Sequence, residues 1–455
     1  MTIGIGVWAL VIYIGVILAV SIILKKDVGI AMLISFIALS FFGVIVTDLG
    51  FFDFIKLGIE AATTETTSYA VMLFVFVSIM MGQTGIIHRL IDILNSLVGR
   101  VRGGSAYVSL IASVLFGSIS GSPGSNATTV GSITIPWMIE DGWKKETAAT
   151  MVCGNSGGGI TTPPSNTMFV LLAVPMIADA VSFAELYKAL WIGGSWTTLF
   201  RFLLVAYFVR KYNIQRRDSS QISSFKKSFK RSWTSLFIFL GVIIPMLLTT
   251  GSFADKLKAM ETIGPAIKKL QLVLLIPVIL LVVLFIEGFK HLPKDKNTWN
   301  EIMKTSIKRY GSVAGPIFFA YCACAVLENL NLAADMSAFL SSLHLSRFLA
   351  VLIVVLIIIL VAGPLTSTAT VTATGAVSYA MLTATGASPL AACITIIVAC
   401  STEGSTPPAS VPCYISSGIA GCEAEKTFVP LLLYYCLPIL IIAVLIGMGI
   451  LPVIF

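Results

Sequence analysis

The chain has 455 residues, of which 57% are hydrophobic and only 11% are charged. Soluble domains have about 25% charged residues, so this composition indicates an integral membrane protein. It excludes a cytosolic enzyme, a secreted disulfide domain and a nucleic-acid-binding protein. The net charge of +8 then concerns orientation in the membrane and not an anionic partner. The 37 glycines and 18 prolines are unexpected in a chain that must be largely helical.

Apolar runs of spanning length define the expected transmembrane helices. About 20 apolar residues cross the hydrocarbon core, and such runs lie at 5–24, 28–47, 68–87, 187–209, 233–250, 271–288, 310–328 and 427–452. The first run has no charged residues before it and no small-residue cleavage site, so we expect a retained span. Residues 50–62 mix apolar and charged side chains, which is typical of an amphipathic helix in the outer interface or packed on the spans.

Lysine and arginine residues indicate which loops face the cytoplasm. The densest clusters, 210–231 and 290–309, are separated by two spans, so both can be cytoplasmic. Lys25 and Lys26, residues 88–102 and the pair Lys144–Lys145 fall on the same side. The loop after residue 250 disagrees with this map, because it is assigned to the outside and carries four lysines (Lys256, Lys258, Lys268 and Lys269).

Two longer regions, 105–182 and 347–420, are crowded with Gly, Ser, Thr and Pro. On the charge map, residues 105–140 leave the cytoplasmic side and return to it. This stretch is too long for one span and too short for two spans with a normal loop. We therefore predict a re-entrant helical hairpin at 105–140 with its turn at 118–126. A second hairpin at 347–385, with its turn at 362–368, is expected to enter from the opposite side.

The two regions also align with each other at a constant offset of 244 residues. Gly131 pairs with Gly375, and Thr162-Pro163-Pro164 pairs with Thr406-Pro407-Pro408. Since the hairpins enter from opposite sides, the halves form an inverted-topology repeat, a common plan among secondary transporters. Convergent low complexity is the alternative explanation for the match.

A broken helix is expected after each hairpin, at 147–182 and 390–420. Clustered glycine and a double proline cannot remain a regular helix, and unwound backbone within a membrane must be buried in protein or line a wet cavity. Free carbonyls and Ser, Thr and Asn oxygens suit Na⁺, and free N–H groups at a helix start suit an anionic group. The alternative is a pair of proline kinks with small residues for close helix packing.

Glu403 in the second break and Arg201 in the predicted span 187–209 are charged residues in apolar surroundings. Glu403 is the only carboxylate in the two glycine- and proline-rich breaks, 153–166 and 401–410. It could ligate a cation, take up a proton, or be held neutral or hydrogen-bonded by neighbouring hydroxyls. We expect the Arg201 side chain to snorkel to the cytoplasmic interface. No Walker A motif, Ser-His-Asp set or phosphate-binding loop is visible. We therefore expect neither ATP-driven pumping nor an enzyme, and no cofactor.

Three stretches of the first half carry a family pattern. They are Met81-Gly82-Gln83-Thr84-Gly85-Ile86-Ile87 with Leu97-Val98-Gly99-Arg100 and Gly103-Gly104; Ser120-Gly121-Ser122 with Gly131, Ile135-Pro136 and Asp141-Gly142-Trp143; and Ile160-Thr161-Thr162-Pro163-Pro164-Ser165. Together they resemble the large membrane subunit (M subunit, DctM-like) of tripartite ATP-independent periplasmic (TRAP) transporters. The similarity extends more weakly through Thr406-Pro407-Pro408 to the last span. Many members of that family have an aspartate after the glycine of the second hairpin, where this chain has Thr366, Ser367 and Thr368.

The resemblance implies an all-α integral membrane fold of the ion-transporter superfamily and an elevator mechanism, in which hairpins and broken helices move against a scaffold. It implies Na⁺-coupled uptake of an organic acid, such as a dicarboxylate or sialic acid, across the cytoplasmic (inner) membrane of a bacterium or archaeon. It also implies two partners that this chain does not contain: a small four-span membrane subunit and a periplasmic substrate-binding protein.

On this hypothesis each hairpin turn, together with the break of the same half, holds one Na⁺, and the substrate lies between the two turns. The expected sodium-binding residues are Ser120, Gly121, Ser122, Asn126, Asn155, Gly158, Thr161, Thr162, Thr366, Thr368, Thr402, Gly404 and Thr406. The expected substrate-binding residues are Ser165, Asn166, Glu403 and Ser410. The expected segments are 1–67 for scaffold spans and an amphipathic arm, 68–209 for the first repeat, 210–309 for basic loops and connecting spans, and 310–455 for the second repeat.

Two other functions fit the same residues. The chain could be a stand-alone permease of the ion-transporter superfamily that works without a binding protein and is proton-coupled through Glu403. A passive channel is a weaker alternative, because a channel does not need an inverted repeat.

Overall fold

The computed structural model describes residues 4–454 apart from 21–23, 25–27, 65, 217–221, 250, 271, 293–294, 333, 336–337, 339–345, 364 and 408–409. Throughout these residues the regular structure is helical, and no strand occurs among them, as the composition predicts. Lys25 and Lys26 of the charge map, and Pro364 and Pro408 of the second half, lie outside the described residues.

Five helices are long and apolar enough to cross a membrane, as judged by length and composition. They are Gly29–Val46, Phe183–Lys211, Phe225–Thr249, Leu274–His291 and Glu425–Gly447, and each overlaps a predicted span. The other three predicted runs fall in α1 (Ile5–Leu18), α4 (Thr66–Thr84) and α17 (Lys296–Asn329). The chain is therefore a multi-pass membrane protein.

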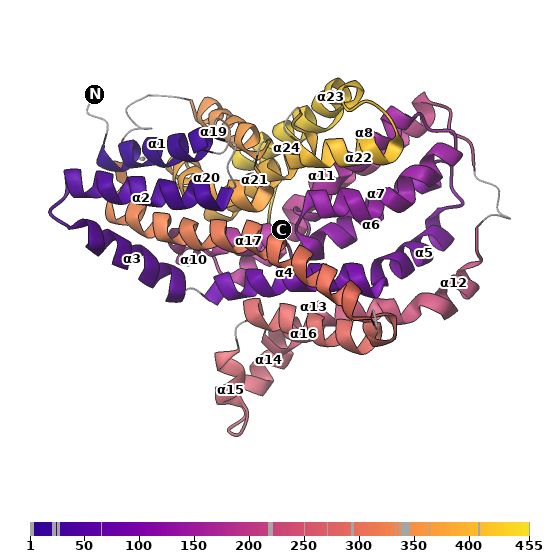
Figure 1. The fold of residues 1–455 in the computed structure, drawn as a ribbon, viewed down its shortest axis with the longest axis horizontal. Helices are drawn as coiled ribbons and strands as arrows, with labels where there is room; N and C mark the ends of the chain where they lie inside the picture. Colours follow the sequence, from indigo (N-terminus) through magenta and orange to yellow (C-terminus); the bar gives the residue numbers. More distant parts are fainter. Residues whose placement is uncertain are drawn as a thin grey trace.

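One side of the molecule is formed by α1, α2 (Val28–Val46), α3 (Phe51–Thr64) and α17 (Figure 1), and α17 packs along both α2 and α3. Helix α3 is the expected amphipathic helix. Its buried residues Phe54, Gly58 and Ala62 are four positions apart and so share one face, whereas Phe52 is 82% exposed. This face holds α3 against the spans.

The expectation that residues 290–309 form a loop before a separate span is wrong. Helix α17 begins at Lys296, where the Asp295 carboxylate caps it by accepting a hydrogen bond from the Thr298 amide at 2.7 Å, and it continues to Asn329. Asp at this position is a favourable helix start. The charged first half and the apolar second half are therefore one continuous 34-residue helix.

Helix α5 (Ile86–Val98) was not predicted as a separate element. The span in α4 ends at Thr84, Gly85 adopts a left-handed backbone conformation with φ of 64°, and α5 begins at the next residue. The apolar face of α5 packs on α6 (Gly104–Ser120) and on α12 (Phe225–Ser232). The sequence does predict a helix here, since Ile86, Ile87, Ile91 and Leu94 follow a helical period. The boundary at Gly85 was missed because the apolar run 68–87 continues across it.

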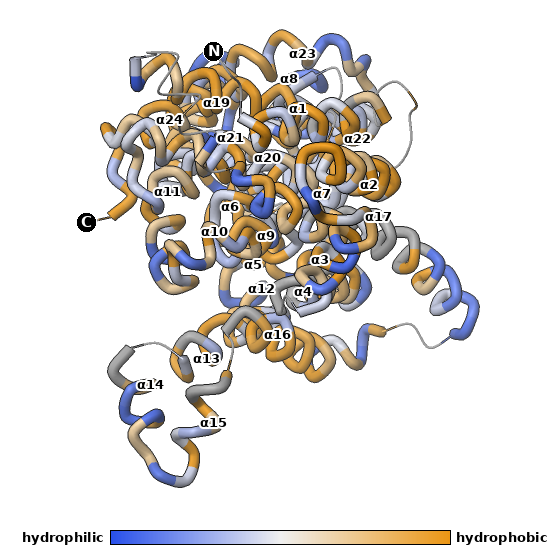
Figure 2. Tube along the Cα trace, turned by 90° about the vertical axis from the view of Figure 1, so that its left-hand side faces the viewer, coloured by the Kyte–Doolittle hydropathy of each residue, from blue (hydrophilic) through white to orange (hydrophobic). Residues whose placement is uncertain are grey.

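The next spans pack against α4 and carry an extension. The 3₁₀ segment η4 (Trp233–Phe239) leads into α13 (Leu240–Thr249), which pairs with α16 (Leu272–Gly288), and α16 packs on α4. Between them, α14 (Gly251–Lys258) and α15 (Gly264–Lys269) project away from the rest (Figures 1 and 2). The four lysines that disagree with the charge map all lie on this extension.

The two Gly-, Thr- and Pro-rich regions contain the same succession of elements. In the first half, the hairpin helices α6 and α7 (Pro123–Glu140) are followed by α8 (Lys145–Ser156), a 3₁₀ turn η2 (Gly157–Gly159) and α9 (Asn166–Leu172). In the second half, the helices α19 (Arg347–Ala362) and α20 (Ser367–Ala384) are followed by α21 (Pro389–Cys400), η6 (Ser401–Ser405) and α22 (Val411–Ala420).

Each half ends in long helices that pack on this core. The short α10 (Pro175–Ala178) leads to α11 (Phe183–Lys211), and α23 (Glu425–Leu431), the π-helical turn η7 (Leu432–Cys436) and α24 (Leu437–Gly447) close the chain. The halves also exchange contacts. Helix α22 packs on α7 and α8, and α9 packs on α20. The short helix after each break therefore lies against the hairpin of the other half, which joins the two halves into one packed body.

Candidate functional site

The first hairpin turn lies directly against the first helix break. The Asn126 amide donates to the Ser156 carbonyl at 2.9 Å and to the Ser113 carbonyl at 2.8 Å. Gly121 ends α6 with φ of 61° and abuts Asn166, so closely that a Cβ at position 121 would overlap the asparagine side chain. Ser122 caps α7 by accepting from the Ser125 amide. The structure thus brings Gly121 and Asn126 against the first broken helix, with Ser120 and Ser122 next to Gly121 in the turn.

Several oxygens at this junction have no hydrogen-bond partner among the described residues. They are the buried Ser120 Oγ, Asn126 Oδ1 and Asn155 Oδ1. Unpaired buried oxygens are costly unless something else satisfies them, and oxygen atoms are the ligands that hard cations bind. The unpaired atoms at the first turn and break are therefore of the chemical type that a small hard cation binds.

Gly158, Thr161 and Thr162 of the first break are hydrogen-bonded to one another, and Thr161 also contacts α11. Both threonine hydroxyls donate to the Gly158 carbonyl, at 3.0 and 3.2 Å, and the Thr161 hydroxyl also lies 2.9 Å from the Thr197 hydroxyl on α11. The Gly158 carbonyl therefore already has two donors. The peptide bond between Pro163 and Pro164 is cis, and Ser165 then caps α9 by accepting from the Met168 amide at 3.2 Å.

The second hairpin and the second break also meet, but their oxygens are mostly paired. Thr366 caps α20 by accepting from the Ala369 amide at 3.2 Å. The Thr402 hydroxyl donates to Ala399, and the Thr406 hydroxyl donates to the Thr402 carbonyl at 3.1 Å. Thr406 lies against Gly363 at the hairpin turn. Thr368 contributes its carbonyl to Thr372. The two halves are therefore unequal, with more free oxygens in the first.

Glu403 faces the start of the second hairpin helix. Its Oε2 accepts a hydrogen bond from the Ser367 amide at 2.5 Å, and the residue is only 5% exposed. A carboxylate at a helix N-terminus is stabilised by the free N–H groups and the helix dipole. The only acid of the two breaks therefore compensates the positive end of α20, whereas the sequence analysis expected an anionic group at the helix start after each break.

The two breaks cross in direct contact. A Cβ at Gly157 would overlap the Ser401 carbonyl oxygen, and one at Gly404 would lie 2.5 Å from the Cys153 carbonyl oxygen. The Cys153 thiol also donates to the Gly404 carbonyl at 2.6 Å. Only glycine lets the two backbones approach this closely. The unwound segments of the two halves therefore form a single centre.

Arg201 belongs to this centre, so the expectation that it snorkels to the interface is wrong. Its side chain on α11 is fully buried, its Nε lies 3.5 Å from the Gly154 carbonyl, and Nη1 and Nη2 have no partner among the described residues. The carbonyl end of α8 is the negative end of that helix dipole. This end accounts for the position of the guanidinium, because it can compensate a buried positive charge.

The four residues expected to bind substrate are all buried beside the crossing. Asn166 touches Gly121, and Asn166 Oδ1 and Ser410 Oγ have no hydrogen-bond partner among the described residues. Ser165 accepts from the Met168 amide at the start of α9, and Glu403 accepts from the Ser367 amide at the start of α20. None of the four lines the large cavity that lies next to the first hairpin.

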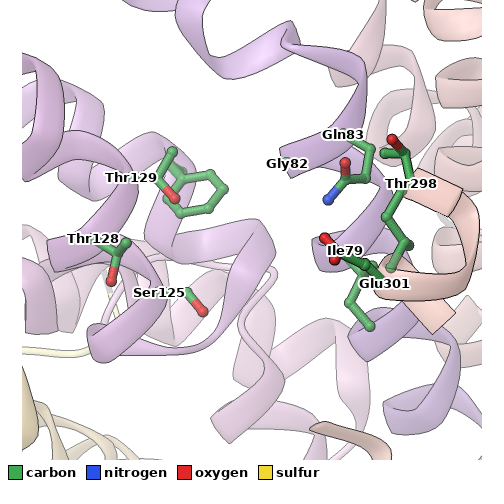
Figure 3. A pocket seen from close by; sticks show the side chains of 10 residues that line it. Ile79, Gly82, Gln83, Ser125, Thr128, Thr129, Thr298 and Glu301 are labelled. Atoms are coloured by element: carbon green, nitrogen blue, oxygen red, sulfur yellow. The ribbon is translucent and has the colours of Figure 1, made fainter. Parts of the chain in front are cut away.

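That cavity, about 510 Å³ in volume, lies between the first hairpin and the helices α4 and α17. Figure 3 shows Ser125, Thr128 and Thr129 of α7 on one side and Gln83, Thr298 and Glu301 on the other. Ile79, Gly82, Phe116 and Ile302 complete the lining. Volumes of 300–1,000 Å³ are typical of small-molecule sites. Sequence reasoning missed this cavity, although Gln83 is a polar residue within the predicted span 68–87.

Comparison with known proteins gives the family. The model for the tripartite ATP-independent periplasmic transporter, DctM component, matches residues 6–453. YgiK of Salmonella typhimurium, an uncharacterised protein, is 30% identical over 186 residues, which are 40% of this chain and 42% of YgiK. The C4-dicarboxylate TRAP transporter large permease protein DctM of Vibrio cholerae is 35% identical over 112 residues, 25% of each chain. The sialic acid TRAP transporter permease protein SiaT of Haemophilus influenzae is 26% identical over 225 residues, 48% of this chain and 35% of SiaT.

The matched segments thus span less than half of these relatives' own lengths.

Two solved structures share the fold. The YdaH transporter of Alcanivorax borkumensis has a TM-score of 0.60 at 18% identity, covering 86% of both chains. MtrF of Neisseria gonorrhoeae has a TM-score of 0.59 at 16% identity, covering 88% of this chain and 84% of MtrF. Since the family model covers nearly the whole sequence, the chain belongs to the DctM family and is a large membrane subunit of the TRAP transporter type.

Proposed function

We propose that this chain is the permease of a Na⁺-coupled uptake system for a small organic acid. A periplasmic substrate-binding protein delivers the solute, and a small four-span subunit accompanies the permease in the cytoplasmic membrane of a bacterium or archaeon. Relatives named for C4-dicarboxylate, isethionate, sialic acid and ectoine transport support a solute of this size and acidity. Family membership supports a permease and not an enzyme.

The observation that carries this proposal is the crossing of two unwound helices beside a hairpin turn with unpaired oxygens. Ser120 Oγ, Asn126 Oδ1 and Asn155 Oδ1 supply neutral oxygens at the first half, and the start of α9 at Asn166 supplies free N–H groups next to the same turn. Cation and carboxylate sites at adjoining broken helices are a recurring solution in secondary transporters. A cation bound at the unpaired oxygens then attracts the solute carboxylate at the start of α9, so binding of each favours binding of the other.

An elevator movement is the mechanism that the packing supports best. The hairpins, breaks and closing helices form one body through the exchanged contacts of α9 and α22, while α1, α2, α3 and α17 form a layer that packs on this body through α17 and α20. The large cavity lies where these two parts face each other. On the charge map the first half of α17 is cytoplasmic, so we assign the cavity to the release side.

Sodium coupling predicts a specific response at the first turn. In proteoliposomes that contain the permease and its two partner proteins, we expect uptake to fall to background when the inward Na⁺ gradient is replaced by K⁺. Ser120→Ala removes an unpaired oxygen and should raise the Na⁺ concentration for half-maximal uptake about tenfold. Ser118→Ala is the matched control, because that hydroxyl already donates to the Leu115 carbonyl at 2.9 Å. Equal uptake in K⁺ would disprove sodium coupling.

Proton coupling through Glu403 is the second candidate function, and its burial beside α20 is the observation that favours it. The amide of Glu403→Gln can still accept from Ser367 but carries no charge and no exchangeable carboxyl proton. We expect this variant to keep Na⁺-dependent uptake with the same profile between pH 6 and 8, and to lose about 1–2 kcal/mol of stability at the helix N-terminus. Uptake that becomes independent of pH only in the variant would instead establish proton coupling.

A further inference from the structure

The charge of the large cavity defines the class of solute that it accepts. We propose that the solute carries a cationic group in addition to its carboxylate, and that Glu301 recognises this group as the solute leaves the hairpin turn. This inference rests on the proposed transport function and deepens it from an organic acid to a zwitterion.

Glu301 is the only charged residue among the ten that line the cavity. It lies on α17, is exposed, and no described residue forms a hydrogen bond or ion pair with its carboxylate. Lys304 is one turn further along the same helix, but it does not line the cavity and forms no ion pair with Glu301. Among the described residues, the carboxylate therefore presents a negative charge without a direct ion pair to whatever enters.

The remaining polar lining complements such a solute. Gln83 lies on the same side as Glu301, and Ser125 and Thr129 face them from α7 (Figure 3). Neutral amide and hydroxyl groups can donate to a solute carboxylate, whereas Glu301 can only accept from a donor or attract a cation. A dianion would find donors on the hairpin side but repulsion at Glu301. A zwitterion is matched at both ends.

The arrangement along the chain supports this division of roles. Ser125 and Thr128 occupy the first two turns of α7, directly after the hairpin turn that carries the unpaired oxygens. Glu301 lies across the cavity on the facing layer. The carboxylate of the solute can thus remain near the hairpin while its cationic group contacts the scaffold side.

The test compares solutes of similar size that differ at one end, where one member of each pair carries an ammonium group. Succinate and 4-aminobutanoate share a four-carbon chain, and isethionate and taurine share an ethanesulfonate; within each pair, the second member carries an ammonium group. Uptake of all four probes is measured in proteoliposomes with the complete transporter, under an inward Na⁺ gradient. Wild type, Glu301→Gln and Glu301→Asp are compared, and Glu328→Gln is the matched control, because Glu328 lies near the other end of α17 and outside the cavity.

We expect wild type to prefer the ammonium-bearing member of at least one pair. Glu301→Gln should lower this ratio about fivefold, Glu301→Asp should restore it, and Glu328→Gln should leave it unchanged. An effect on gating or on Na⁺ attraction would change both members alike and leave the ratio intact, which would overturn the inference. Preferential uptake of the anionic members would overturn it while leaving the proposed function in place. Uptake of the probes that does not depend on Na⁺ would overturn both.

Discussion

Gly157→Ala is expected to abolish uptake, because the added methyl group would occupy the space of the Ser401 carbonyl oxygen. The clash is with backbone and not with the flexible end of a side chain, so neither broken helix can relieve it by a rotamer change. We expect a loss of about 3 kcal/mol in stability, and uptake below one tenth of wild type, because the crossing must open. Thermal unfolding in detergent and uptake in proteoliposomes measure these two effects.

Gly418→Ala is the matched control for this prediction. Gly418 lies in α22, the helix that follows the second break, and a Cβ there meets no atom within 4 Å. Replacing a helical glycine by alanine without a clash stabilises a helix by about 0.5–1 kcal/mol, so this variant should unfold at a slightly higher temperature and transport normally. Wild-type stability and uptake in Gly157→Ala would show that the two breaks do not cross as described.

The sequence predicted the local elements of the centre well, because local chemistry determines them. Helix α6 ends at Ser120 and α7 begins at Pro123, within the turn expected at 118–126. Helix α8 ends at Ser156, where the glycines begin, and η6 contains Glu403 as expected for the second break. Glycine, proline and hydroxyl-bearing residues change backbone preferences at the position where they stand, so one sequence suffices to locate them.

What the sequence could not give are the contacts between distant segments. Arg201 was assigned to the interface because it lies near the cytoplasmic half of its predicted span, yet its Nε lies beside the Gly154 carbonyl at the end of α8, 47 residues away. The cavity was missed for the same reason, since Gln83 and Glu301 come from helices far apart in sequence. The pairing of Arg89 with Glu287 spans 198 residues. Such contacts follow from tertiary packing and have no periodic signature.

This last pair is the basis of a second large effect, which we expect in Glu287→Gln. Arg89 at the start of α5 donates to both carboxylate oxygens of Glu287 on α16, at 2.8 and 2.6 Å, and also to the Thr84 carbonyl at 3.0 Å. The side chains are 14% and 3% exposed. Thr234 adds a further hydrogen bond to the same carboxylate at 2.9 Å. The pair thus fixes α5 to the spans.

The amide of Glu287→Gln keeps the shape but leaves the Arg89 guanidinium without its counter-charge in a buried position. Breaking one side of such a pair costs about 3–5 kcal/mol, so we expect the thermal midpoint in detergent to fall clearly. The double variant Arg89→Met/Glu287→Gln should recover part of the loss, with a coupling energy of about 1–3 kcal/mol. Glu423→Gln is the control, because its pair with Lys426 is 72% and 55% exposed and should contribute less than about 1 kcal/mol. Equal effects of Glu287→Gln and Glu423→Gln would mean that the α5–α16 pair is solvated, and that α5 is held to the spans by its apolar face alone.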